Sequence, residues 1–211
     1  MLEGEAASAL SAALRKDAPV SDRDFDRLFP QSQRMRSYLH WTPVDVAVRA
    51  CALLAPGNET QVLDIGAGVG KLCLIGAAIT RATWIGVEIN PRMVEAANHA
   101  ARLLGVADRA LFVCGDAHSI DWAAFDSLYF FNPFVEALFG SSKSSVPRRQ
   151  EFIANLERAK LQLARMRPST RVVTYHGFGG EMPNGFDLVH HEDAGEDRLC
   201  LWVRRARCAI E

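Results

Sequence analysis

The chain has 211 residues, of which 49% are hydrophobic and 23% charged, and its net charge is -1. This length suits one domain with a full core and a modest appendage, and is short for two complete domains. The near-neutral charge argues against a dedicated nucleic-acid binder, which normally carries a strongly basic face. No apolar run approaches the roughly 20 residues that a membrane span needs.

Neither the N-terminus nor the cysteines indicate export. The first 16 residues lack a basic region followed by an uninterrupted apolar run, so we expect no signal peptide and a cytoplasmic location. The five cysteines are odd in number and never form a CxxC pair, which favours reduced packing residues over a disulfide framework or a zinc site. No metal site is predicted.

Helical segments are expected before residue 57, over 5–16, 22–28 and 44–54. Ser21 is suited to cap the second segment, and Thr42 with Pro43 to open the third. We therefore divide the chain into an N-terminal helical extension, residues 1–56, and a core, residues 57–211.

From residue 57 onward, apolar strands alternate with helices, a pattern typical of a parallel sheet. The expected strands are 61–65, 83–89, 110–114, 127–131, 171–176, 186–191 and 198–204, and the expected helices are 71–80, 92–104 and 148–166. Only about six residues, the acidic turn EDAGED, separate the last two strands, whereas a parallel crossover needs roughly a dozen. The prediction is an α/β fold with a seven-stranded, mostly parallel sheet that ends in an antiparallel hairpin. A surface loop is expected over 140–147, GSSKSSVP.

The most informative stretch is 62–71, VLDIGAGVGK, an apolar strand that runs into a glycine-rich turn. Asp64 lies near the carboxyl end of the strand, and the three glycines let the backbone turn tightly and approach a ligand closely. Lys71 stands where the dinucleotide fingerprint GxGxxG has its third glycine. The pattern DxGxGxG therefore favours a different adenosine cofactor.

Acids also end the next two strands. Glu88 closes the second strand, where a carboxylate can accept both hydrogens of a ribose diol. Asp116 follows the third strand, where it can accept a hydrogen bond from an adenine amino group. For each acid alone, a solvated strand end or a helix cap is an equally good interpretation, but three acids along one crevice favour a ligand.

The fourth strand ends in FFNPF. The Asn132 side-chain carbonyl and the Pro133 backbone carbonyl can both accept from an incoming N–H group and so orient a nitrogen lone pair. Phe134 can wall the site, stack on a planar group or face a cation. The alternative is that Asn-Pro only ends the strand in a turn.

Together these segments resemble the class I S-adenosylmethionine-dependent methyltransferases, a Rossmann-like seven-stranded family, over about residues 61–204. The resemblance implies S-adenosylmethionine as cofactor, S-adenosylhomocysteine as product and no metal. The cofactor contacts that it implies are Thr42, Asp64, Gly66, Ala67, Gly68, Gly70, Glu88, Ile89, Asp116, Ala117 and Asn132. The catalytic residues that it implies are Asn132, Pro133 and Phe134, and His176 is added as a catalytic candidate from its place at the end of the fifth strand.

Two subfamilies are relevant. N-methyltransferases of exocyclic amines or amides usually carry Asn or Asp, two prolines and an aromatic residue, and the missing second proline counts against a nucleobase substrate. DIGAGVGK, GVEIN and FFNPF also look like segments of the non-SET histone lysine methyltransferases, although the N-terminal parts correspond poorly. Relatives with a similar Thr-Pro step, here within residues 40–43, close over the cofactor, so residues 1–56 are interpreted as a cover. A helix N-cap is the alternative for Thr42.

The predicted reaction is direct methyl transfer to a nitrogen of a protein side chain or small molecule, driven by alignment and desolvation. A lysine acceptor of pKa about 10.4 would cost about 4–5 kcal/mol to present as a neutral amine at pH 7. For an oxygen acceptor, His176 is a better general base than His118 or Tyr175, although strand-end histidines are often structural.

Two other functions are kept as alternatives. One is a non-catalytic scaffold that only binds the cofactor. The other is modification of RNA or DNA, for which a set of basic residues would track a backbone, although solvated helix faces explain them equally well. That set is Arg34, Arg36, Lys143, Arg148, Arg149, Arg158, Lys160, Arg165 and Arg167. A protein or small-molecule acceptor is favoured over nucleic acid, and no membrane partner is expected.

Overall fold

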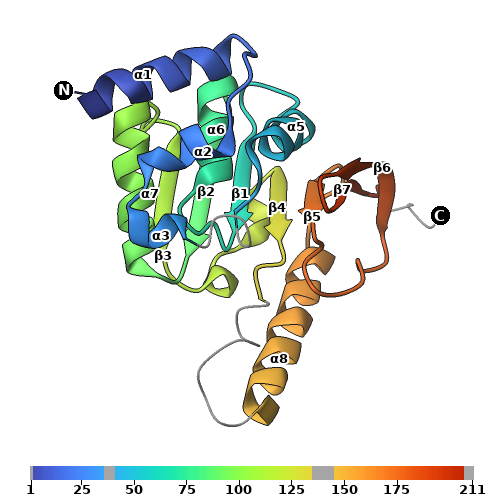
Figure 1. The fold of residues 1–211 in the computed structure, drawn as a ribbon. Helices are drawn as coiled ribbons and strands as arrows, with labels where there is room; N and C mark the ends of the chain where they lie inside the picture. Colours follow the sequence, from blue (N-terminus) through green and yellow to red (C-terminus); the bar gives the residue numbers. More distant parts are fainter. Residues whose placement is uncertain (1, 36–40, 135–144, 207–211) are drawn as a thin grey trace.

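The computed structural model describes residues 2–35, 41–134 and 145–206. A seven-stranded sheet with the strand order β3-β2-β1-β4-β5-β7-β6 forms its centre (Figure 1). The strands are β1 Gln61–Ile65, β2 Thr83–Glu88, β3 Ala110–Cys114, β4 Ser127–Phe131, β5 Arg171–Tyr175, β6 Phe186–Ala194 and β7 Asp197–Arg204. The first five strands pair in parallel, and β7 runs antiparallel to both β5 and β6. The predicted fold class is confirmed.

Successive residues of each strand point to opposite faces of the sheet, and each face has its own core. Val62 and Tyr129 pack in the core shared with α1, α5, α6 and α7, whereas Leu63 and Phe130 pack in the core shared with α8. The α-helices are α1 Leu2–Arg15, α2 Asp22–Phe25, α3 Gln31–Arg34, α5 Val44–Leu54, α6 Lys71–Ile79, α7 Pro91–Leu104 and α8 Ser145–Ala164. Short 3-10 helices are η1 Asp26–Leu28, η2 Ala117–Ser119 and η3 Trp122–Ala124. Within the described residues, no helix is both long enough and apolar enough to cross a membrane.

The predicted strands and helices are present in the structure, which adds the short elements α3, η2 and η3. Two of the predicted boundaries differ in ways that change a loop. The helix expected to start at residue 148 starts at Ser145, so the end of the predicted loop 140–147 is helical, and residues 140–144 lie outside the described residues. The predicted six-residue acidic turn is wrong, because β6 continues to Ala194 and β7 begins at Asp197. Gly195 opens the remaining two-residue turn at φ 62°, a conformation that glycine adopts without strain.

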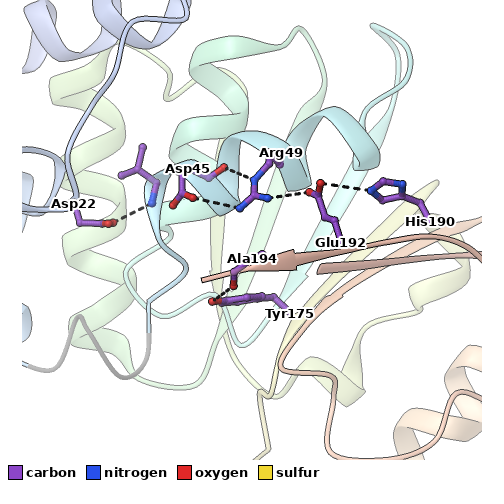
Figure 2. Close-up of polar contacts among 8 residues, drawn as sticks. Asp22, Asp45, Arg49, Tyr175, His190, Glu192 and Ala194 are labelled. Carbon is purple, nitrogen blue, oxygen red and sulfur yellow. Dashed lines mark hydrogen bonds and ion pairs between the residues drawn. The ribbon is translucent and has the colours of Figure 1, made fainter. Parts of the chain in front are cut away.

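The start of α5 also differs from prediction. Ser21 caps α2 as expected, accepting from the Asp24 amide at 3.1 Å, but Thr42 does not cap α5. The amide of Val44 instead donates to Asp22 Oδ1 at 2.9 Å (Figure 2). The Thr42 hydroxyl shares a buried hydrogen bond of 2.8 Å with the Tyr129 hydroxyl on β4. Thr42 therefore joins the N-terminal extension to the sheet.

Candidate functional site

The glycine-rich turn lies at the carboxyl ends of β1, β2 and β4. The amides of Gly66 and Ala67 donate to the Val87 carbonyl at 2.9 and 3.0 Å, which ties the turn to β2. Gly66 has φ 75°, and a Cβ atom there would lie 2.8 Å from Pro133 Cβ. Only glycine therefore allows the turn to pass so close to the segment after β4. At Gly68, with φ 57°, a Cβ atom would have nothing within 4 Å, so open space borders this part of the turn.

Beside the turn lies a small pocket formed by residues of the N-terminal extension, β1, the turn, α6 and β4. Its lining residues are Trp41, Thr42, Asp64, Gly66, Ala67, Val69, Lys71, Leu72, Tyr129 and Phe131. The predicted contacts Thr42, Asp64, Gly66 and Ala67 thus come together here. Of the Thr-Pro segment 40–43, residue 40 lies outside the described residues.

Asp64 is a buried carboxyl group in the wall of this pocket. Burial is the main reason why its pKa rises from 3.8 to about 7. The Cys73 thiol donates a hydrogen bond to Oδ2 at 3.6 Å, which lowers the pKa, whereas the nearby charge of Glu88 raises it further. Near neutral pH the group is therefore partly protonated and partly ionised. A cation bound beside it would favour the carboxylate.

Glu88 connects the glycine turn to the start of α7. Its Oε2 accepts from the Gly68 amide at 2.9 Å, and its Oε1 accepts from the Asn90 amide at 2.8 Å. Each oxygen keeps a further lone pair that can accept from a hydroxyl group. Ile89 follows just after the strand with 73% of its surface exposed, so an apolar side chain stands free beside the carboxylate.

Asp116 is the N-cap of η2, which was one of the two interpretations of this acid that the sequence allowed. Its Oδ1 accepts from the His118 amide at 2.9 Å at the start of η2, and its Oδ2 accepts from Arg158 Nη2 at 3.1 Å. Ala117 begins η2, and its carbonyl accepts from Trp122 Nε1 at 2.8 Å. The adenine contacts predicted for Asp116 and Ala117 stay predictions.

Asn132 combines two unusual features. It has φ 42°, a left-handed conformation that asparagine tolerates better than most residues, while its amide donates to the Gly177 carbonyl at 2.9 Å. Its side-chain Oδ1 is buried and has no hydrogen-bond donor among the described residues. A buried acceptor without a partner is rare in proteins and calls for an explanation.

Phe134 is part of the core rather than a free wall of the site. Its ring is 8% exposed and stacks on His118 with 5.1 Å between centroids, and His118 stacks in turn on Trp122 at 5.7 Å. Both ring nitrogens of His118 are buried without a partner in the described part of the chain. Burial and the charge of Arg158 lower the pKa of His118, which favours the neutral ring. The sequence did not indicate this stack.

His176 lies beside the carboxylate of Asp197, a partner that the sequence did not predict. It follows β5 at φ 57°, and its Nδ1 lies 2.7 Å from Oδ2 of Asp197. Asp197 is the first residue of β7, which runs antiparallel to β5 and so begins near the carboxyl end of that strand. The only sequence signal was an acid in the predicted hairpin turn. Tyr175 does not face a ligand through its hydroxyl, which donates to the Ala194 carbonyl at 2.9 Å (Figure 2).

The basic residues of α8 and the turn after it are mostly paired. Arg158, Lys160 and Arg167 contact Asp116, Glu157 and Asp126, respectively, at 2.9 to 3.2 Å. Arg36 and Lys143 lie outside the described residues. In the parts of the chain that are described, no three or more His, Cys, Asp or Glu side chains group in a way that could hold a metal ion.

A family model described as a methyltransferase domain matches residues 56–168. Sterol 24-C-methyltransferase of Debaryomyces hansenii is 36% identical over 83 residues, which are 38% of this chain and only 22% of that protein.

Among solved structures, an RNA methyltransferase from Salinibacter ruber in complex with S-adenosyl-L-homocysteine has a TM-score of 0.57 at 20% identity, covering 80% of this chain and 94% of that one. A mutant of MtNAS in complex with S-adenosylmethionine has a TM-score of 0.54 at 18% identity, covering 94% and 73%. At such identities the likeness shows the fold alone. Because the family model spans more than half of the 211 residues and solved methyltransferases share the fold, the chain belongs to the class I S-adenosylmethionine-dependent methyltransferases.

Proposed function

We propose that this protein transfers the methyl group of S-adenosylmethionine to a nitrogen of a protein side chain or a small molecule. The observation that carries the proposal is the buried, unpartnered Oδ1 of Asn132. A buried acceptor without a donor costs roughly 1–3 kcal/mol, a cost that a bound N–H group would remove. If the Pro133 carbonyl accepts from the same substrate group as Oδ1, that group must have two N–H or O–H hydrogens, which an amino group has and a hydroxyl group lacks.

The residues present fit the proposed cofactor. The turn is open at Gly68, Asp64 would favour a cationic group, and Glu88 keeps lone pairs for two hydroxyls. Ile89 offers an exposed apolar side chain to a ring, and Thr42 lines the pocket from the N-terminal side. When bound, S-adenosylmethionine would supply an electrophilic methyl group on a sulfonium.

The contribution of the chain would be alignment and exclusion of water. Trp41, Tyr129 and Phe131 line the pocket with aromatic surface, and Asn132 would orient the acceptor nitrogen. Fixing two reactants in attack geometry can supply roughly 7–11 kcal/mol of a barrier. An alkyl amine such as a lysine side chain would additionally have to lose a proton, at a cost of about 4–5 kcal/mol at pH 7.

The alternatives receive less support. Pairing of Arg158, Lys160 and Arg167 with acids favours a solvated helix face over a strip that follows a nucleic-acid backbone. Binding to an RNA duplex that weakens steeply with salt would instead favour nucleic-acid modification. A scaffold would bind S-adenosylmethionine but methylate no acceptor.

Calorimetry with S-adenosylmethionine and with NAD tests the identity of the cofactor.

Two glycine variants test the position of the cofactor site. Gly68→Ala and Gly105→Ala each place a side chain at positive φ in open space, but Gly105 lies at the end of α7 and is the control. Each variant should cost roughly 1–2 kcal/mol of stability. Only Gly68→Ala should lower the affinity for S-adenosylmethionine, by about tenfold or more, which corresponds to about 1.4 kcal/mol. Tighter binding of NAD, or equal affinities of the two variants, would contradict the proposal.

A further inference from the structure

His176 and Asp197 form a histidine–carboxylate pair at the carboxyl edge of the sheet. Nδ1 and Oδ2 lie 2.7 Å apart, the distance of an ion pair when the ring is protonated. The β6–β7 hairpin is attached to the end of β5 near this contact, because the Tyr175 hydroxyl donates to the Ala194 carbonyl (Figure 2). A Cβ atom at Gly195 would lie 3.3 Å from that hydroxyl, so the turn packs closely against β5.

The imidazole ring is fixed on several sides. Phe131, which lines the pocket, stacks on it with 5.0 Å between centroids and 21° between planes, and the Tyr175 ring meets it edge-on at 4.5 Å. His176 adopts φ 57°, which is uncommon for a residue other than glycine, although histidine adopts it more often than most residues. Such strain tends to gather at functional sites.

The pair is adjacent to the proposed acceptor site. Asn132, the other left-handed residue at this edge, donates its amide to the carbonyl of Gly177, the residue after His176. Phe131 precedes Asn132 and stacks on His176. The ends of β4 and β5 therefore hold an amide oxygen and an imidazole in neighbouring positions.

The short contact with Asp197 also favours one position of the ring proton. A carboxylate can only accept, so Asp197 requires the proton of the neutral imidazole on Nδ1. Nε2 then keeps its lone pair, and it has no hydrogen-bond partner among the described residues. An oriented imidazole with a free Nε2 is the arrangement of a general base.

We propose that Asp197 is a positioning residue that holds His176 as the proton acceptor for an alkylammonium substrate. This inference rests on the proposed function and narrows it to basic amines rather than amides. The ammonium proton moves to Nε2, which leaves the nitrogen lone pair free. That pair forms the N–CH3 bond while the C–S bond breaks and its electrons stay on sulfur, and the imidazolium stays paired with Asp197 until it releases the proton to water.

The tautomer of His176 tests the positioning without any acceptor. In ¹⁵N-labelled protein, with His176→Gln to assign the signals, the wild type should show the proton on Nδ1, and Asp197→Ala should shift the ring towards a mixture of tautomers. Glu192→Gln is the matched control, because Glu192 faces His190 at 3.8 Å on the same hairpin (Figure 2). A wild-type proton on Nε2, or no change in Asp197→Ala, would overturn the proposal.

Turnover with two amines tests the chemical role. Butylamine is protonated at neutral pH and aniline is not, so Asp197→Ala should lower kcat about 100-fold with butylamine and little with aniline, without raising KM for S-adenosylmethionine. Glu192→Gln should match the wild type. Equal losses with both amines, or no methylation of butylamine by protein that binds S-adenosylmethionine, would overturn the inference. Absence of S-adenosylmethionine binding would instead refute the proposed function.

Discussion

Asp64 is a buried carboxyl group that ionises differently in the folded protein and in the unfolded chain. It is 4% exposed, its Oδ2 accepts from a thiol rather than from a cation, and its pKa is raised to about 7. The folded protein therefore holds a proton on Asp64 at pH values where the unfolded chain, with a pKa of 3.8, has lost it.

This difference predicts a pH dependence of stability. Because the folded pKa is raised, the contribution of Asp64 is complete below about pH 4 and is lost as the pH rises to about 7. Asp64→Asn removes the titration. Relative to the wild type, the variant should gain about 3 kcal/mol in unfolding free energy between pH 5 and pH 8, measured by urea denaturation. A stability difference that stays constant over this range would show that Asp64 ionises normally.

At the scale of elements, the N-terminal extension is attached to the glycine turn through one buried lysine. Lys71, the first residue of α6, forms ion pairs with Asp22 of α2 and, at 2.8 Å, with Asp26 of η1. Its Nζ lies 6.0 Å from the centroid of the Trp41 ring in the pocket wall. The elements that would cover the cofactor are thus joined to the turn that would hold it.

Removal of this lysine should be costly. Lys71→Met leaves Asp26 buried without its partner, and we expect a loss of about 3–5 kcal/mol of stability in urea denaturation. Arg27→Met is the control, because it removes an exposed pair of 3.5 Å with Asp24 and should cost no more than about 1 kcal/mol. Similar losses in the two variants would mean that the buried pairs do not hold the extension.

The elements themselves could be predicted because apolar runs such as 61–65 and 127–131 end at glycine, proline or polar residues. The pairing of single residues far apart in the chain could not be predicted. Lys71 with Asp26, and His176 with Asp197, depend on how whole elements pack, and such contacts leave no periodic pattern. The predicted hairpin turn is too long because Glu192 and Asp193 are residue types typical of a loop. In the structure both residues pair with β7 and so belong to β6.

At the scale of the molecule, the order of the strands separates two halves of the site. β2 and β3 are added on one side of β1, whereas β4 and β5 are added on the other side, so the strand order reverses between the parallel strands β1 and β4. Ligands of α/β sheets bind at such a point. The ends of β1 and β2 carry the proposed cofactor residues, and the ends of β4 and β5 carry Asn132 and His176. A Cβ atom at Gly66 would lie 2.8 Å from Pro133 Cβ, so glycine at this position allows the two halves of the site to approach each other closely.

The central claim is that Asn132 presents a nitrogen to the methyl donor. Methyl transfer from [methyl-¹³C]S-adenosylmethionine to butylamine, aniline, acetamide and butanol, with products identified by NMR, tests it most directly. The wild type should form N-methyl products only. Asn132→Gly, which keeps the left-handed backbone without strain, should lower kcat at least about tenfold, whereas Asn98→Ala on α7 should not. An O-methyl or C-methyl product, or full turnover by Asn132→Gly, would contradict the account.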